Sequence, residues 1–237
     1  MPRSDRTEAL RTVWHTRSVT DPGGDPDPRP DPSPIQAVVF DMGGVLLDWN
    51  PRHLYRTVFA DEDAMERFIE ELDLVAWNVA NHDSGAVPLD ESVAELARRH
   101  PRYAEELAHW GNRYVEMVSG PVEGSLEILA ELHGRVPLYL LSNVPREPIA
   151  QLQLDWPFFA WFDGMVISAH EGLIKPDPRL FRVLLDRYDL VPEATVFIDD
   201  VQANVDAAAA LGIRAIRFDS APELRRDLVR LGLLSPP

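Results

Sequence analysis

Residues 35–46 have the sequence IQAVVFDMGGVL, and this stretch decides the fold of the chain. Its first half is apolar and partly β-branched, which predicts a strand buried on both faces of a sheet. Asp41 stands where this strand ends, and Gly43 and Gly44 allow a tight turn directly after it. Chemistry in open α/β sheets sits at the carboxyl ends of strands. The stretch therefore indicates a ligand site, or else an ordinary turn that ends a strand.

Apolar strands alternate with helices in the second half of the chain. This alternation predicts a doubly wound parallel sheet, a Rossmann-like α/β core with helices on both faces. A helix is expected to open at Gly120-Pro121 and to end at His133. The predicted strands that follow it lie at 136–141, 164–167, 195–198 and 213–218.

The segment between residues 54 and 118 has a different pattern. Glu, Ala, Leu and Arg recur there at helical spacing, without a convincing strand, and the last helix is expected at 103–118. We interpret this segment as a small helical cap inserted after the first strand. The predicted domains are a disordered Pro/Asp-rich leader at 1–34, the α/β core at 35–52 and 119–237, and the cap at 53–118.

The composition excludes several classes of protein. A formal charge of −16 argues against nucleic acid and anionic membranes as partners, although a metal ion could still admit a small anionic substrate. The absence of cysteine excludes disulfides, thiolate nucleophiles and Cys-ligated zinc. No apolar run approaches membrane-spanning length, so we expect a cytoplasmic protein. The oligomeric state cannot be predicted from this sequence.

Polar side chains follow three of the predicted strands. Asp41 ends the first, Ser142-Asn143 the second and Asp199-Asp200 the third, and Lys175 precedes a proline between the last two. Each group alone could serve structure, as a strand end, a helix cap or a solvated lysine. Together, and in this order on an α/β frame, they indicate a site for phosphate and metal.

With these four motifs, residues 35 to about 220 resemble the haloacid-dehalogenase-like hydrolase superfamily. The helical insertion resembles the small cap of its first subfamily. The Gly43-Gly44 variant, with Trp77 and Asp83-Ser84-Gly85, is similar to a branch that includes sugar-1-phosphate phosphatases. The same branch includes the phosphatase-like domain of some epoxide hydrolases.

The resemblance implies hydrolysis of a small phosphorylated metabolite, with a sugar-1-phosphate as one candidate. Asp41 would attack phosphorus and form an aspartyl-phosphate, while Lys175 and Mg²⁺ neutralise charge. The resemblance implies that Asp41, Asp200 and the Gly43 carbonyl bind the metal ion. It implies that the Gly44 amide, Ser142 and Asn143 bind phosphate oxygens. Asp199 and Asn204 would lie behind these ligands and support them.

Gly43 departs from the superfamily pattern. Phosphatases of this superfamily usually carry a second aspartate there, which acts as general acid and base. Its loss removes a proton donor worth roughly 10²–10⁴-fold in rate, so leaving groups that need little protonation are favoured, as in sugar-1-phosphates, acyl phosphates and aryl phosphates. Asp48 or His53 could stand in, because they lie in a segment expected to overhang the site, although they better fit a hinge of the cap.

Two other functions stay open. A metal-independent 2-haloacid dehalogenase would also use Asp41 and lack the second aspartate, but Asp199-Asp200 would then have no clear role. A catalytically weak binding or regulatory protein is favoured by Gly43 and opposed by the otherwise complete site. Phosphate release from p-nitrophenyl phosphate, with and without Mg²⁺, distinguishes all three.

Overall fold

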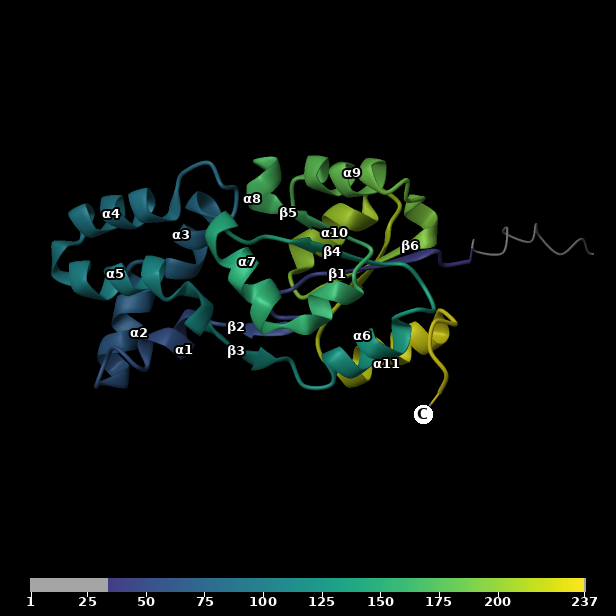
Figure 1. The fold of residues 1–237 in the computed structure, drawn as a ribbon, viewed down its shortest axis with the longest axis horizontal. Coiled ribbons are helices and arrows are strands. Elements are labelled where there is room, and N and C mark those ends of the chain that lie inside the picture. Colours follow the sequence, from purple (N-terminus) through teal and green to yellow (C-terminus); the bar gives the residue numbers. More distant parts are fainter. Residues whose placement is uncertain (1–33, 237) are drawn as a thin grey trace, which may run out of the picture. The chain divides into compact units, whose positions relative to one another are not determined.

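The computed structural model describes residues 34–236, whose elements are arranged around a five-stranded parallel sheet (Figure 1). The predicted leader lies outside the described residues, apart from Pro34. The strand order is β5-β4-β1-β6-β7. The strands are β1 (Ala37–Phe40), β4 (Leu138–Ser142), β5 (Gly164–Ile167), β6 (Thr195–Asp199) and β7 (Arg214–Arg217). Strand order reverses at β1, and such switch points are where open α/β sheets bind ligands.

Strand β1 is buried because it has a hydrogen-bonded partner on both edges and helices on both faces. Val38 is in register with Leu138 of β4 and with Val196 of β6. Val38 and Phe40 belong to one hydrophobic cluster, and Val39 between them belongs to another. The continuous apolar run of the sequence thus has the two-sided burial that it predicted.

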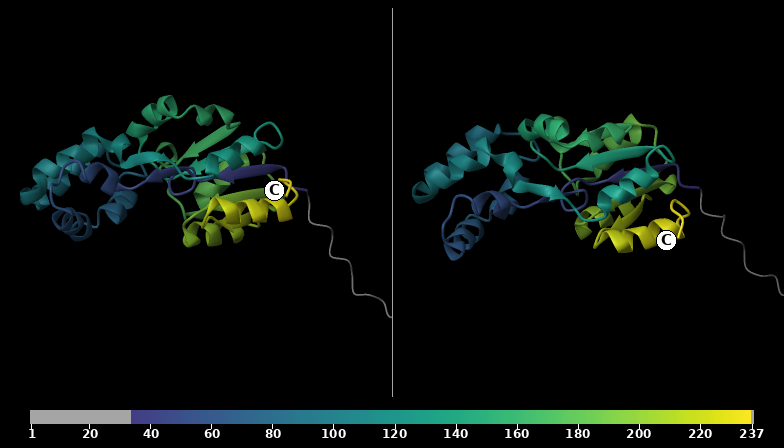
Figure 2. Two further views of the ribbon diagram at one scale, coloured as in Figure 1. Left: turned by 90° about the horizontal axis from the view of Figure 1, so that it is seen from below. Right: turned by 60° about the horizontal axis from the view of Figure 1, so that its bottom comes forward.

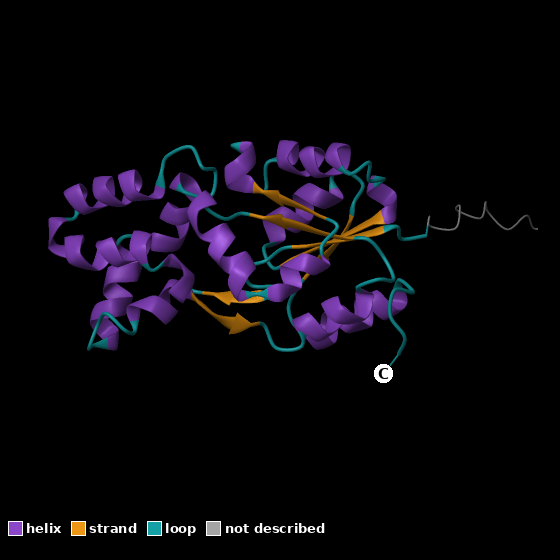
Figure 3. Ribbon diagram, viewed as in Figure 1, coloured by secondary structure: helices purple, strands orange, loops and turns teal. Residues whose placement is uncertain are grey.

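Helices cover both faces of the sheet, which confirms the predicted fold class (Figures 2 and 3). One face packs against α6 (Ser125–Leu132), α7 (Arg146–Asp155) and α11 (Ala221–Arg230), with η3 (Pro157–Trp161). The other packs against α9 (Pro178–Arg187) and α10 (Gln202–Ala209). The short α8 (Ser168–Glu171) follows β5, and η4 (Pro192–Ala194) precedes β6. Across residues 34–236 no helix is long and apolar enough to cross a membrane.

Residues 50–117 are all described and contain helices but no strand. They form α1 (Pro51–Tyr55), α2 (Glu62–Glu71), α3 (Leu74–Asn81), α4 (Leu89–Arg99), η1 (Pro101–Tyr103), α5 (Ala104–Asn112) and η2 (Tyr114–Met117). Their apolar side chains build a separate hydrophobic cluster around Trp110, whose ring lies 5.7 Å from that of Trp77 and 6.2 Å from that of Tyr114. We call this helical segment the cap. Its status as a separate domain stays a prediction.

A two-stranded antiparallel ribbon joins the cap to the core. It consists of β2 (Leu47–Trp49) and β3 (Val118–Pro121), with Leu47 opposite Pro121 and Trp49 opposite Val118. The prediction of one helix over 103–118 was therefore wrong at its C-terminal end, and the next helix opens at Ser125, not at Gly120-Pro121. A four-residue strand whose partner lies about 70 residues away leaves no periodic signal of its own.

Replacing Trp110 with alanine should remove the centre of the cap's hydrophobic cluster. Its side chain is fully buried, and loss of a buried aromatic costs about 3–5 kcal/mol of the free energy of unfolding. Leu154→Ala is the matched control, because Leu154 is 77% exposed and should change stability by less than about 0.5 kcal/mol. Urea unfolding of the two variants measures the difference. Similar midpoint shifts would contradict the central role of Trp110.

Candidate active site

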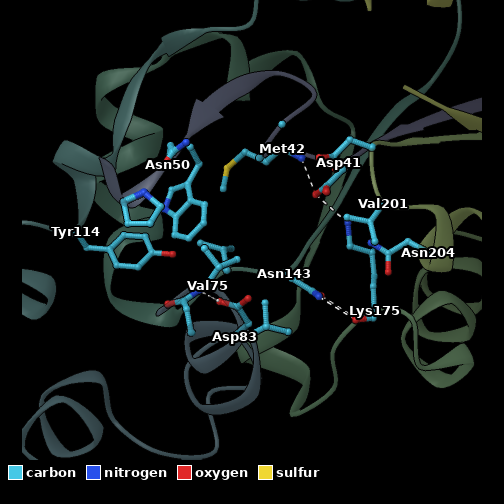
Figure 4. A pocket seen from close by; sticks show the side chains of 18 of the residues that line it. Asp41, Met42, Asn50, Val75, Asp83, Tyr114, Asn143, Lys175, Val201 and Asn204 are labelled. Carbon is cyan, nitrogen blue, oxygen red and sulfur yellow. Dashed lines mark hydrogen bonds and ion pairs between the residues drawn. The ribbon is translucent and has the colours of Figure 1, made fainter. Parts of the chain in front are cut away.

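A pocket of about 340 Å³ opens where the carboxyl ends of β1, β4 and β6 meet (Figure 4). The core contributes Asp41, Lys175 and Asp200 to its lining, and the cap contributes Asp83 and Tyr114. Charged groups of the core therefore face the cap across one cavity. The pocket coincides with the switch point of the sheet.

Lys175 lies at the centre of the charged groups. Its Nζ is 2.8 Å from Asp41 Oδ1 and 2.7 Å from Asp199 Oδ2, and it donates to the Leu141 carbonyl at 3.0 Å. These acceptors use all three N–H groups of an ammonium. Burial alone lowers the pKa of Lys175, but the two carboxylates raise it above its ordinary value, so the side chain is charged. The ammonium thus joins the ends of β1, β4 and β6.

Asn143 fixes the backbone of Lys175. The Asn143 Oδ1 accepts the Lys175 N–H at 2.8 Å, and the Asn143 Nδ2 donates to the Lys175 carbonyl at 3.0 Å. Asn143 also lines the pocket, whereas the neighbouring Ser142 is buried at the end of β4 and does not line it. Their phosphate-binding roles stay predictions. The structure shows Asn143 holding the lysine segment in place.

Asp199 and Asp200 have different surroundings although they are adjacent. Asp199 is fully buried, with Oδ1 accepting from the Val201 N–H and the Asn204 Nδ2, both at 2.9 Å, and Oδ2 facing Lys175. Asp200 lines the pocket and is partly exposed, and burial, then the adjacent Asp199, raises its pKa. Asp199 therefore lies behind the pocket and Asp200 in it, while their predicted roles in metal binding stay predictions.

The donor set suits a divalent cation. Ligand oxygens of Asp41, Asp199 and Asp200 lie within 4.8 Å of one another, the one such acidic or histidine group among residues 34–236. With all three carboxylates ionised, the single ammonium of Lys175 leaves two negative charges uncompensated. Burial raises the pKa of Asp41 to about 7, although Lys175 opposes this. Carboxylate oxygens are the ligands that Mg²⁺ and Ca²⁺ prefer, so the residues present fit such an ion.

The two glycines that follow Asp41 and Met42 differ in how much space each leaves for a side chain. Gly44 has φ +75°, and a Cβ there would lie 2.4 Å from Asp200 Oδ2. Its N–H donates to the Leu47 carbonyl at 2.9 Å and so closes the turn, and its role in phosphate binding stays a prediction. A Cβ at Gly43 would meet only Trp49 Cβ, at an ordinary 3.7 Å.

Asp48 and His53 do not reach the pocket. His53 Nε2 lies 3.0 Å from Asp48 Oδ2, and the Ser119 hydroxyl donates to the same oxygen at 2.7 Å. Neither residue lines the pocket, although residues 49–52 of the same segment do, so the segment borders the site while these two side chains do not reach it. Because Asp48 is on β2, Ser119 on β3 and His53 on α1, their contacts connect the ribbon to the cap.

Asp83 received no role from the sequence, yet it lines the pocket from the cap. Asn78 Nδ2 donates to its Oδ1 at 2.9 Å, and Asn78 Oδ1 lies 3.1 Å from His82 Nδ1. His82 Nε2 contacts the Ser92 hydroxyl. Burial raises the pKa of Asp83 to about 7 and lowers that of His82 to about 4. The signal in the sequence was the Asp83-Ser84-Gly85 motif, which supported the resemblance to one branch of the superfamily but gave no role to the carboxyl group of Asp83.

The loop that carries Asp83 is packed against the core. The Ser168 hydroxyl donates to the Asp83 carbonyl and accepts the Val144 N–H at 3.0 Å. Gly85 has φ +64°, and a Cβ there would lie 2.4 Å from the Ala169 carbonyl oxygen. Backbone of the cap and backbone of the core thus meet without an intervening side chain.

The fold and the site define the class of protein: a doubly wound α/β fold with a buried lysine and an acidic cluster at the switch point of its sheet. Within that class, the chain belongs to the haloacid dehalogenase-like hydrolases, whose family model matches residues 35–212. The predicted family is therefore confirmed, and the chain is a hydrolase by family.

Two phosphatases are among its relatives. A sesquiterpene phosphatase of Aspergillus oryzae is 28% identical over 183 residues, covering 76% of this chain and 87% of that protein. A phosphorylated carbohydrates phosphatase of Thermotoga maritima is 30% identical over 188 residues, covering 77% and 84%. A haloacid dehalogenase-family enzyme of Bacteroides thetaiotaomicron, solved with magnesium and inorganic phosphate, shares the fold. Its TM-score is 0.62 at 17% identity, covering 78% of this chain and 95% of that one.

Gly44→Ala should destabilise the protein more than Gly43→Ala does. The first variant places a Cβ against Asp200 in a left-handed conformation, whereas the second gains only an ordinary contact. Strain of this kind costs on the order of 1–3 kcal/mol. Chemical unfolding of both variants without added metal gives the two free energies. Equal losses would show that the close approach of Gly44 to Asp200 does not constrain the turn.

Proposed function

We propose that this protein is a Mg²⁺-dependent phosphatase that cleaves phosphate monoesters of a small molecule through an aspartyl-phosphate on Asp41. The observation that carries the proposal is the Asp41 carboxylate, which faces the pocket with Lys175 at 2.8 Å and Asp200 beside it. Family membership and the phosphatase relatives support it. A cytoplasmic location stays a prediction from the sequence.

The hydrogen bonds of Asp41 favour one oxygen as the nucleophile. Its Oδ1 accepts the Met42 N–H at 2.7 Å and faces Lys175 Nζ at 2.8 Å. In the described residues no donor reaches Oδ2, so this oxygen is left to attack phosphorus. The fixed carboxylate and the adjacent ammonium hold nucleophile and phosphate charge in one place, which is how positioned groups lower such barriers.

The metal site is proposed on residues that line the pocket. Asp41, Asp200 and the Gly43 carbonyl would hold Mg²⁺, and Asp199 and Asn204 would support them from behind. When bound, the ion neutralises charge on the phosphoryl oxygens. Lys175 keeps Asp41 oriented, and its positive charge neutralises that of the approaching phosphate, which is the role the sequence analysis expected of it.

The carbon part of the substrate is proposed to be apolar. Val75, Val79 and Val201 are 41%, 36% and 48% exposed, and all three line the pocket. Of the polar groups that line it, Arg52 is paired with Glu66 at 2.6 Å, so its guanidinium is engaged within the cap. Neither of the two cations of residues 34–236 that line the pocket, Arg52 and Lys175, is therefore free to bind sugar hydroxyls. This lining favours an apolar or aromatic alcohol over the sugar-1-phosphate that the family resemblance suggested.

The first test is phosphate release from p-nitrophenyl phosphate with Mg²⁺ or with EDTA. We expect turnover with Mg²⁺, none with EDTA, and none in Asp41→Asn, because the amide is isosteric but not nucleophilic. Asp90→Asn, an exposed change in the cap, is the control and should retain full rate. Retained turnover in Asp41→Asn would overturn the covalent mechanism. Halide release from a 2-haloacid in EDTA would instead identify a dehalogenase.

The second test compares esters that differ only in polarity. Cyclohexylmethyl phosphate and glucose 6-phosphate both join a six-membered ring to phosphate through a primary alcohol. We expect kcat/KM to favour the cyclohexyl ester by about tenfold or more, because apolar contacts in a pocket give discrimination of this size. Val79→Asn should narrow the ratio, whereas Val191→Asn, exposed and outside the pocket, should not. A preference for the sugar ester would overturn the apolar assignment.

A further inference from the structure

The proposed phosphatase reaction requires a proton donor that has not yet been assigned to a residue. The inference that follows rests on that proposed function. When the ester bond breaks, the leaving alkoxide needs a proton, and Gly43 has no side chain to supply it. Asp48 and His53 lie outside the pocket. A different acidic group must face the leaving oxygen if alkyl esters are to be cleaved at useful rates.

The stereochemistry of phosphoryl transfer says where that group must be. The attacking and leaving oxygens lie roughly in line on opposite sides of phosphorus. Asp41 approaches from the core, so the leaving oxygen points toward the cap. Asp83 lines the same pocket from the cap, and Figure 4 shows Asp83 and Asp41 on opposite sides of the cavity.

We propose that Asp83 is the general acid that protonates the leaving oxygen, in place of the aspartate missing at position 43. The carboxyl group is supplied by the loop between α3 and α4. Asp83 is also placed to act as the base in the second half of the reaction.

The surroundings of Asp83 favour its protonated form. The side chain is 3% exposed, and burial raises the pKa to about 7, with Asn78 opposing the shift and Asp41 adding to it. Asn78 Nδ2 donates to Oδ1 at 2.9 Å, so Oδ2 is the oxygen that can carry the proton. The bond from Asn78 therefore orients the acid as well as binding it.

The residues behind Asn78 hold it in one orientation. Asn78 Oδ1 faces His82 Nδ1 at 3.1 Å, and His82 Nε2 contacts the Ser92 hydroxyl. Burial lowers the pKa of His82 to about 4, so the ring is neutral near pH 7 and can donate one proton while accepting another. With Nδ1–H donating to Asn78 and Nε2 accepting from Ser92, every partner in this chain of hydrogen bonds is satisfied.

The core fixes the position of the loop itself. The Ser168 hydroxyl donates to the Asp83 carbonyl, and Gly85 packs directly against the Ala169 carbonyl. These contacts set the separation of Asp83 from Asp41 through the backbone. A general acid needs such positioning, because proton transfer requires hydrogen-bond distance to the leaving oxygen.

The chemical steps balance. Asp41 Oδ2 forms a bond to phosphorus as the ester P–O bond breaks, and the Asp83 proton moves to the departing oxygen to give the alcohol and an Asp83 carboxylate. Water then attacks the aspartyl-phosphate, Asp83 takes a proton from this water, and the P–O bond to Asp41 breaks. Inorganic phosphate leaves, and both aspartates return to their starting states.

Tyr114 is the other cap residue with an acidic proton in the pocket, and it provides the matched control. Its pKa is raised well above the ordinary value, by burial first and then by Asp83, so it is a far weaker acid than Asp83. If Asp83 is the donor, Tyr114→Phe should not change how the rate depends on the leaving group. If Tyr114 were the donor, this variant would show the change instead.

The experiment measures kcat/KM with Mg²⁺ for a series of aryl and alkyl phosphates of falling leaving-group acidity. We expect a shallow dependence in wild type and in Tyr114→Phe. Asp83→Asn should keep most of the rate on p-nitrophenyl phosphate and lose roughly 10²–10⁴-fold on alkyl esters. Asp83→Glu should restore part of the alkyl rate. Binding of inorganic phosphate and the melting temperature check that each variant is folded, and Asp83→Ala replaces Asp83→Asn if the amide folds poorly.

The outcomes separate this inference from the proposed function. If the wild type hydrolyses the series and Asp83→Asn shows the same dependence of kcat/KM on leaving-group acidity, Asp83 is not the general acid. The proposed phosphatase function is then unaffected. An equal loss on all esters indicates a structural role and also overturns it. A wild type that hydrolyses none of the esters with Mg²⁺ overturns the proposed function, and the role of Asp83 falls with it.

Discussion

The ammonium of Lys175 is the interaction on which the rest of the site depends. It lies between Asp41 and Asp199 and also donates to the Leu141 carbonyl, so one charge neutralises and joins the ends of three strands. Removing one partner from a buried ion pair costs about 3–5 kcal/mol, because the remaining charge is left uncompensated. The order β4-β1-β6 brings these three strand ends together, and Asn143 brings the lysine to them. The fold and the site therefore both depend on the positive charge of Lys175.

Core and cap contribute different chemistry to the same pocket. The core supplies charge, with Asp41, Lys175 and Asp200 at the sheet edge. The cap supplies the exposed valines of α3 and a single buried carboxyl group, Asp83. In the proposed reaction the core would hold the phosphoryl group, and the cap would hold the alcohol and protonate it. Substrate choice could then change through the cap while the phosphoryl chemistry of the core stays the same.

The sequence predicted those features that depend on local pattern. The apolar run of β1 and the polar residues after each strand predicted the sheet, the family and the convergence of Asp41, Lys175 and Asp199. The sequence pattern did not predict features that depend on pairing between distant segments. The β2–β3 ribbon, and with it the placement of Asp48 away from the pocket, depends on contacts between residues about 70 positions apart. The carboxyl group of Asp83 reaches the pocket only because the core binds its loop, and no periodicity encodes that contact.

The contact between the Asp83 loop and α8 bears on how such proteins could be recombined. The loop lies against the core through the Ser168 hydroxyl and through Gly85 at the Ala169 carbonyl. A cap transplanted from a relative would bring its own loop but would meet the Ser168 and Ala169 of this core. Exchange of caps between family members is therefore constrained by core residues, Ser168 and Ala169, which lie outside the cap itself. A working chimera would need to exchange the start of α8 together with residues 53–118.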